Sequence, residues 1–69
     1  MTEILKFKVF CIERYKVAHH MSGKDTLDLF IQFGVLDYLG AFYDVLHTVG
    51  DRYIVSDIDE FIAVRQQVQ

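Results

Sequence analysis

The amino-terminal segment, from Thr2 to about Met21, constrains the fold more than any other part of the sequence. It contains no Gly or Pro, and Thr2 followed by Glu3 is a typical helix start. On a helical wheel its apolar residues point in nearly every direction, so one neighbouring helix cannot cover them. We expect a single long helix, with part of its surface buried by a second copy of the chain or by another protein.

The length and composition suit one small helical domain over residues 1–69. Hydrophobic residues make up 52% of the chain, which is typical of a folded domain rather than a disordered segment. Cys11 is the single cysteine and cannot form an intramolecular disulfide, as is usual for proteins of the reducing cytoplasm. The apolar runs are too short to span a bilayer. We therefore expect a cytoplasmic protein that has no membrane partner.

The charge distribution is unfavourable for binding nucleic acid. The net charge is −3, and the seven basic residues are dispersed along the chain. Proteins that bind the phosphate backbone usually gather Lys and Arg on one face. We expect the partner to be another protein.

The middle of the chain predicts two further helices. Ser22-Gly23-Lys24-Asp25 resembles a capping box, with Asp in place of the usual Glu, and should start the second helix. Gly34 suits the left-handed position that ends it. The segment from about Val35 to Thr48 has the cleanest amphipathic pattern in the sequence and predicts a third helix.

A turn and a β-prone run precede the last helix. Gly50-Asp51-Arg52 has turn chemistry, and Tyr53-Ile54-Val55 is the one β-prone run in the chain. We expect this run to be extended, and Ser56 or Asp57 to cap the last helix. The predicted fold class is all-α, a small bundle of four helices with one short extended segment before the last helix.

A histidine and three acids around this turn are the best candidates for chemistry. His47, Asp57, Asp59 and Glu60 could converge on a metal or general-base site. Each also has a structural explanation, because histidine suits the carboxyl end of a helix and acids suit the amino end. We favour the structural explanation, and so predict a protein with no enzymatic activity, no catalytic residues, no metal and no cofactor.

The tyrosines and the β-prone run suggest a partner-binding surface instead. Tyrosine joins an apolar ring to a hydroxyl that needs a hydrogen-bonding partner, and it is common at protein interfaces. An extended run can bind a second protein by adding a strand to it. Together with the first helix, the predicted partner-binding residues are Tyr43, His47, Tyr53, Ile54, Val55 and Asp57.

The carboxyl-terminal half of the chain also resembles a known family. The residues that carry the resemblance are Gly34-Val35-Leu36-Asp37-Tyr38-Leu39 and Leu46-His47-Thr48-x-Gly50-x-x-Tyr53-Ile54-Val55-x-Asp57-Ile58-Asp59-Glu60-Phe61-Ile62. They are similar to a family of small uncharacterised bacterial proteins classed as a domain of unknown function. The resemblance implies that relatives are often encoded beside ADP-ribosyltransferase-like proteins, and it implies no catalytic residues.

These observations lead to three hypotheses of different classes. The first is a non-enzymatic protein–protein interaction module, an accessory or antitoxin-like partner of an ADP-ribosyltransferase-like toxin, that also forms a homo-oligomer. The second is a small dimeric DNA-binding regulator, in which the sharp junction at Gly34 belongs to a helix-turn-helix. The third is a small enzyme, which requires His47 and the three acids to converge. We favour the first.

Overall fold

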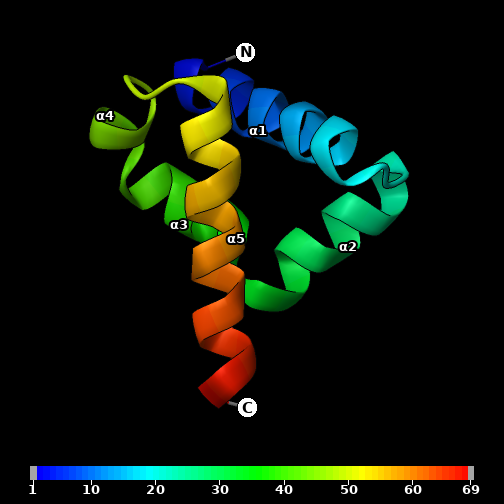
Figure 1. Ribbon diagram of the computed structural model, residues 1–69. Coiled ribbons are helices and arrows are strands. Elements are labelled where there is room, and N and C mark those ends of the chain that lie inside the picture. Colours follow the sequence, from blue (N-terminus) through cyan, green and yellow to red (C-terminus); the bar gives the residue numbers. More distant parts are fainter. Residues whose placement is uncertain (1, 69) are drawn as a thin grey trace.

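The computed structural model describes residues 2–68, which fold into helices with no strand among them (Figure 1). The five helices in chain order are α1 (Glu3–His19), α2 (Gly23–Phe33), α3 (Val35–Ala41), α4 (Tyr43–Leu46) and α5 (Asp51–Val68). The all-α fold class is confirmed, but the helix count is five rather than four. None of these helices is both long enough and apolar enough to cross a lipid bilayer.

The first two helices begin and end where the sequence predicts. The Thr2 hydroxyl accepts a hydrogen bond from the Leu5 N–H at 3.1 Å, and the Ser22 hydroxyl accepts one from the Asp25 N–H at 3.0 Å. Both contacts satisfy amide groups that have no partner within the helix. At the other end of α2, Gly34 has a φ of 71°, the left-handed conformation expected of it.

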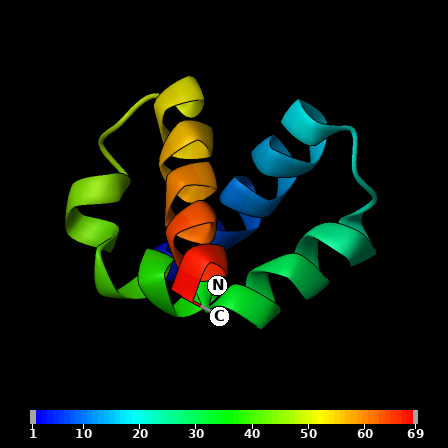
Figure 2. The same cartoon turned by 60° about the horizontal axis from the view of Figure 1, so that its bottom comes forward.

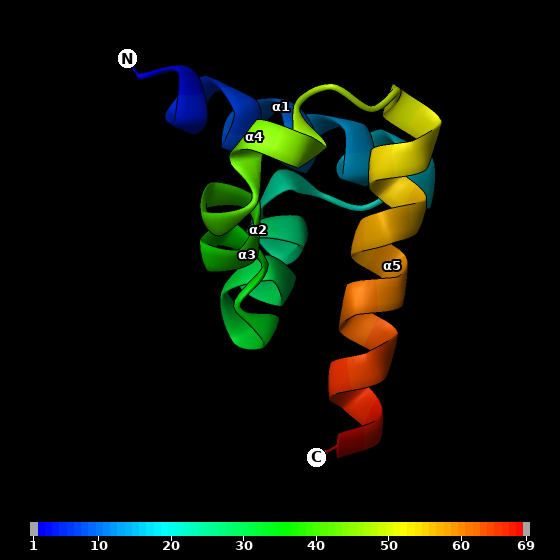
Figure 3. The same cartoon turned by 90° about the vertical axis from the view of Figure 1, so that its left-hand side faces the viewer.

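The core lies where α1, α2, α3 and α5 meet. In the view of Figure 2, α5 stands between α4 and α1. Figure 3 shows the first turns of α5 near α1, while its last turns project beyond the other helices. Burial raises the pKa of the Cys11 thiol to about 12, so this thiol stays protonated inside the core. The buried apolar residues are Cys11, Tyr15, Phe30, Phe33, Val35, Leu39, Leu46, Ile54, Ile58 and Ile62.

The predicted third helix is wrong as a single element. It breaks at Phe42, whose φ of −111° and ψ of 23° are not helical, and this break separates α3 from the single turn of α4. After the break, Leu46 enters the core and the Tyr43 ring contacts the Phe7 ring edge-on, with 5.5 Å between the centroids. Phe42 itself stays 54% exposed. These contacts join residues after the break to α1 and to the core. The amphipathic pattern of residues 35–48 carries no information about them, so the break could not be predicted from it.

The predicted extended segment is also wrong, because Tyr53, Ile54 and Val55 lie inside α5. The helix begins at Asp51, and the Ile54 N–H already donates to the Gly50 carbonyl at 3.0 Å. Neither Ser56 nor Asp57 caps the helix, since both lie within it. The physical reason is burial: Ile54, Ile58 and Ile62 recur every fourth residue and are at most 5% exposed. Their packing outweighs the few tenths of a kcal/mol that each β-branched residue costs a helix.

Candidate functional site

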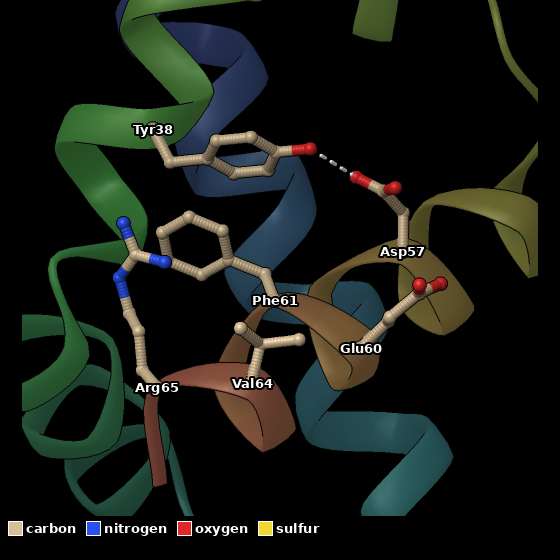
Figure 4. Close-up of a pocket in the computed structure, with 6 residues that line it drawn as sticks. All are labelled: Tyr38, Asp57, Glu60, Phe61, Val64 and Arg65. Carbon is tan, nitrogen blue, oxygen red and sulfur yellow. Dashed lines mark hydrogen bonds between the residues drawn. The ribbon is translucent and has the colours of Figure 1, made fainter. Parts of the chain in front are cut away.

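A surface groove between α3 and α5 combines aromatic, aliphatic, acidic and basic side chains. Its volume is about 250 Å³. Five of its residues come from one face of α5, at the spacing i, i+3, i+4, i+7 and i+8 that aligns side chains along a helix. The sixth residue, Tyr38, comes from α3 (Figure 4). We call this site the α3–α5 groove, and its residues are Tyr38, Asp57, Glu60, Phe61, Val64 and Arg65.

Stacked side chains build the groove's inner wall. The rings of Tyr38 and Phe61 are nearly parallel, with 4.1 Å between their centroids and 22° between their planes. The Arg65 guanidinium lies over the Phe61 ring, 3.6 Å from its centroid (Figure 4). Stacking and cation–π contacts of this kind hold rings and guanidinium groups in place. The wall is therefore formed before any partner arrives.

Carboxylates line the other side of the groove. The Tyr38 hydroxyl donates a hydrogen bond to Asp57 Oδ2 at 2.6 Å. Burial, followed by this hydrogen bond, raises the pKa of Tyr38 to about 12, so the hydroxyl stays protonated. The ion pairs formed within residues 2–68 include neither Asp57 nor Glu60. Both carboxylates lie on the same side of Phe61 (Figure 4) and can accept hydrogen bonds from a cationic group.

The Tyr38 hydroxyl and Val64 define what this groove offers to a partner. The Tyr38 hydroxyl already donates to Asp57, and its raised pKa opposes the phenolate that a nucleophile or base would need. Val64 is 52% exposed and presents an apolar surface beside the stacked rings. A partner could place an apolar side chain on Val64 and a basic one beside the carboxylates.

Tyr43 and His47, two of the predicted partner-binding residues, lie in a different groove. Their rings stack with 4.4 Å between centroids, and His47 Nδ1 donates to the Tyr43 carbonyl at 2.6 Å. They line a groove of about 360 Å³ between α1, α4 and α5, together with residues such as Phe10 and Val49.

Of the other four predicted residues, Ile54 lines the same groove as Tyr43 and His47, and the remaining three are dispersed. Ile54 is 1% exposed and belongs to the core. Val55 is half-buried and lines a shallow groove against α1, whereas Tyr53 is 65% exposed. Only Asp57 lies in the α3–α5 groove. The structure therefore brings Tyr43, His47 and Ile54 to one groove and places the other predicted residues elsewhere. Residues 53–55 are helical, so they do not offer the extended edge that strand addition needs.

The convergence required by the enzyme hypothesis is also missing. His47 contacts Tyr43, and Asp57 accepts from Tyr38. Asp59 Oδ1 accepts from the Tyr15 hydroxyl at 2.7 Å and lies 3.0 Å from His19 Nε2, so it joins α5 to the end of α1. Across residues 2–68, His, Cys, Asp and Glu side chains nowhere gather in the threes that a metal ion needs.

Comparison with known proteins places the chain in a family. A family model described as "Protein of unknown function (DUF3791)" matches residues 6–65, a range that runs from α1 into the last turns of α5. The chain belongs to this family. No curated protein and no solved structure gives a significant match. The resemblance seen in the sequence is thus confirmed as membership of a family of unknown function.

Most residues of the α3–α5 groove were missed by sequence reasoning in this DUF3791 member. The sequence pattern explains Glu60 by the start of a helix and does not single out Phe61, Val64 or Arg65. A signal did exist, because residues 57, 60, 61, 64 and 65 share one face of a helix that begins before them. The expectation that residues 53–55 are extended starts the helix at residue 56 or 57, and residues 57 and 60 are then explained by the helix start rather than by a shared face.

Proposed function

We propose that this protein is a non-enzymatic binding module that holds a segment of another protein in the α3–α5 groove. The observation that carries the proposal is the pairing of exposed Val64 and the stacked Tyr38–Phe61 wall with two carboxylates that no cation of residues 2–68 pairs with. Interfaces commonly place aromatic and apolar anchors beside polar groups in this way. The segment that fits this groove carries an apolar residue next to a Lys or Arg.

The resemblance supplies the first candidate partner. It implies that relatives are encoded beside ADP-ribosyltransferase-like proteins, so the proposal makes this chain an accessory or antitoxin-like partner of such a protein. Cys11 is unpaired and buried, which fits a reducing cytoplasm as the place of action. In this role the chain acts by occupying or positioning its partner.

Isothermal titration calorimetry of the purified chain against the ADP-ribosyltransferase-like product of an adjacent gene tests the proposal. Val64→Asp and Glu60→Lys change the apolar and acidic sides of the groove and should each weaken binding at least about tenfold. Ile31→Asp is the matched control, because Ile31 is 63% exposed on α2 and lies outside the groove. It should bind like the unchanged protein.

The outcomes separate the parts of the proposal. If all three variants bind equally well, the partner is right and the groove is wrong. If the unchanged chain produces no binding heat over the micromolar range, the ADP-ribosyltransferase-like partner is wrong.

The DNA-binding alternative gains no support from the helices around Gly34. The helix after this junction, α3, carries Asp37 and no Lys or Arg. A recognition helix normally brings basic residues to the phosphate backbone and the base edges. We therefore do not propose DNA binding.

A further inference from the structure

The face of α1 opposite the buried Cys11 and Tyr15 carries a stripe of exposed residues. At its border with α4 and α5, the stripe residues Lys6, Phe10 and Val17 also line surface grooves. The stripe follows the spacing i, i+3, i+4, i+7 and i+11, which stays on one side of a helix. Its apolar members are large and accessible: Val9 is 46% exposed, Phe10 is 40% exposed and Val17 is 61% exposed. Figure 1 shows α1 along one edge of the molecule, with α2 and α3 on one side of it. We call these residues the α1 stripe: Lys6, Val9, Phe10, Glu13 and Val17.

The two charged members of the stripe are opposite in sign and symmetrically placed. Lys6 and Glu13 are seven residues apart, which is about 10 Å along the axis and nearly the same direction around it. The midpoint between them falls between Val9 and Phe10. The stripe therefore has an apolar centre with a positive charge on one side and a negative charge on the other.

We propose that a second copy of this chain covers the α1 stripe, with the two α1 helices antiparallel. A two-fold axis beside Val9 and Phe10 brings Val9 of each copy against Phe10 of the other copy. The same axis places Lys6 of one copy opposite Glu13 of the second copy, and it does so twice. This self-complementarity is what an isologous interface requires.

The charges specify the direction of the pairing. In a parallel arrangement Lys6 would lie against Lys6 of the second copy, and Glu13 against its own counterpart, so like charges would repel. Within the chain, Lys6 lies 3.5 Å from Glu3, and Glu13 lies 3.3 Å from Lys16. Exposed pairs of this kind contribute little to stability, so the side chains are free to exchange partners.

The size of the stripe sets the expected strength. A helix of 17 residues is about 25 Å long, and one helix face is smaller than the roughly 800 Å² per partner of a standard stable interface. The dimer should therefore dissociate on dilution within the micromolar range.

Charge reversal with sedimentation equilibrium at low salt tests this proposal. Lys6→Glu and Glu13→Lys each turn both intermolecular pairs into like-charge contacts, and each should raise the dimer dissociation constant at least about tenfold. The double variant Lys6→Glu/Glu13→Lys restores opposite charges across the axis and should restore the dimer. Within each chain of the double variant, residue 6 is still repelled by Glu3 and residue 13 is still repelled by Lys16. A recovered dimer would therefore reflect the restored contacts between the two copies.

Lys24 and Asp28 provide the matched control. They form an exposed pair on α2 with 2.9 Å between Nζ and Oδ2, away from the α1 stripe. Reversing either charge should leave the dimer unchanged, and circular dichroism confirms that each variant remains helical.

Two results would overturn the proposal. One is a monomer for the unchanged chain across the micromolar range. The other is a dimer that the single reversals do not weaken or that the double reversal does not restore. The α1 stripe shares no residue with the α3–α5 groove, so calorimetry with the partner protein reports on the proposed function independently.

Discussion

Replacing Ile54 tests whether residues 53–55 belong to α5, where the sequence pattern predicts an extended segment. Ile54 is 1% exposed, whereas its neighbour Tyr53 is 65% exposed on the same turn of α5. Ile54→Ala removes buried methyl and methylene groups and should lower the free energy of unfolding by about 2–5 kcal/mol. A chain of 69 residues is expected to have only about 3–10 kcal/mol in total. This one substitution should therefore remove a large fraction of the stability.

Tyr53→Ala is the matched control for this experiment. Both substitutions introduce Ala into the same helix, so the gain in helix propensity is similar and the difference isolates burial. Tyr53→Ala should change the free energy of unfolding by no more than about 0.5 kcal/mol. Urea unfolding followed by far-UV circular dichroism measures both variants.

Ile54→Val keeps the test informative if Ile54→Ala fails to fold. It should cost about 0.5–1.5 kcal/mol, which leaves a measurable unfolding transition. Equal losses for the substitutions at Ile54 and Tyr53 would refute the placement of Ile54 in the core. They would instead favour an exposed run, as the β-prone pattern suggests.

Three further predictions follow from the same contacts. Ser22→Ala should lower the free energy of unfolding by about 1 kcal/mol, because it removes the cap of α2. Ser56→Ala should raise it slightly, because Ser56 lies within α5, where Ala has the higher helix propensity. Urea unfolding measures both changes. By the same measurement, Asp59→Ala should lower the free energy of unfolding by about 1–2 kcal/mol, because it removes the acceptor of the buried Tyr15 hydroxyl. Asp51→Ala breaks the exposed ion pair with Arg14 and should lower it by no more than about 0.5 kcal/mol. The folded state holds the Tyr38 proton more tightly than the unfolded chain does, so the free energy of unfolding should fall as the pH rises from about 10 through about 12. Tyr38→Phe should flatten part of that fall in a series of unfolding curves against pH.

Features that rest on contacts within one turn of the chain could be predicted from the sequence. Thr2 and Ser22 cap their helices through an amide three residues ahead, and Gly34 adopts a left-handed conformation that most other residues resist. These effects need no information about distant residues. The start of α1 and both ends of α2 follow from them, whereas α1 ends at His19, two residues before the expected Met21.

Features that rest on contacts between distant residues could not be predicted. The break at Phe42 accompanies the contact of Tyr43 with Phe7, which lies far away in the sequence. The β-branched residues at positions 54 and 55 favour a strand locally, yet α5 forms because Ile54 is buried in the core.

The α3–α5 groove depends on both kinds of information. Asp57 was recognised as a candidate, but its hydrogen bond to Tyr38 spans 19 residues and exists only after α3 and α5 pack together. The face of α5 that carries Phe61 and Val64 becomes visible in the sequence only when the helix is started at Asp51. Fold class was therefore easier to predict than the site.

The most direct test of the central claim is a nuclear magnetic resonance titration of the isotope-labelled chain with the unlabelled partner proposed for it, an ADP-ribosyltransferase-like protein. Binding in the α3–α5 groove predicts that the amide signals of Asp57, Glu60, Phe61 and Val64 shift or broaden first, with those of Leu27 and Ile31 on α2 unchanged. Saturating partner that leaves the four groove signals unperturbed would contradict the account.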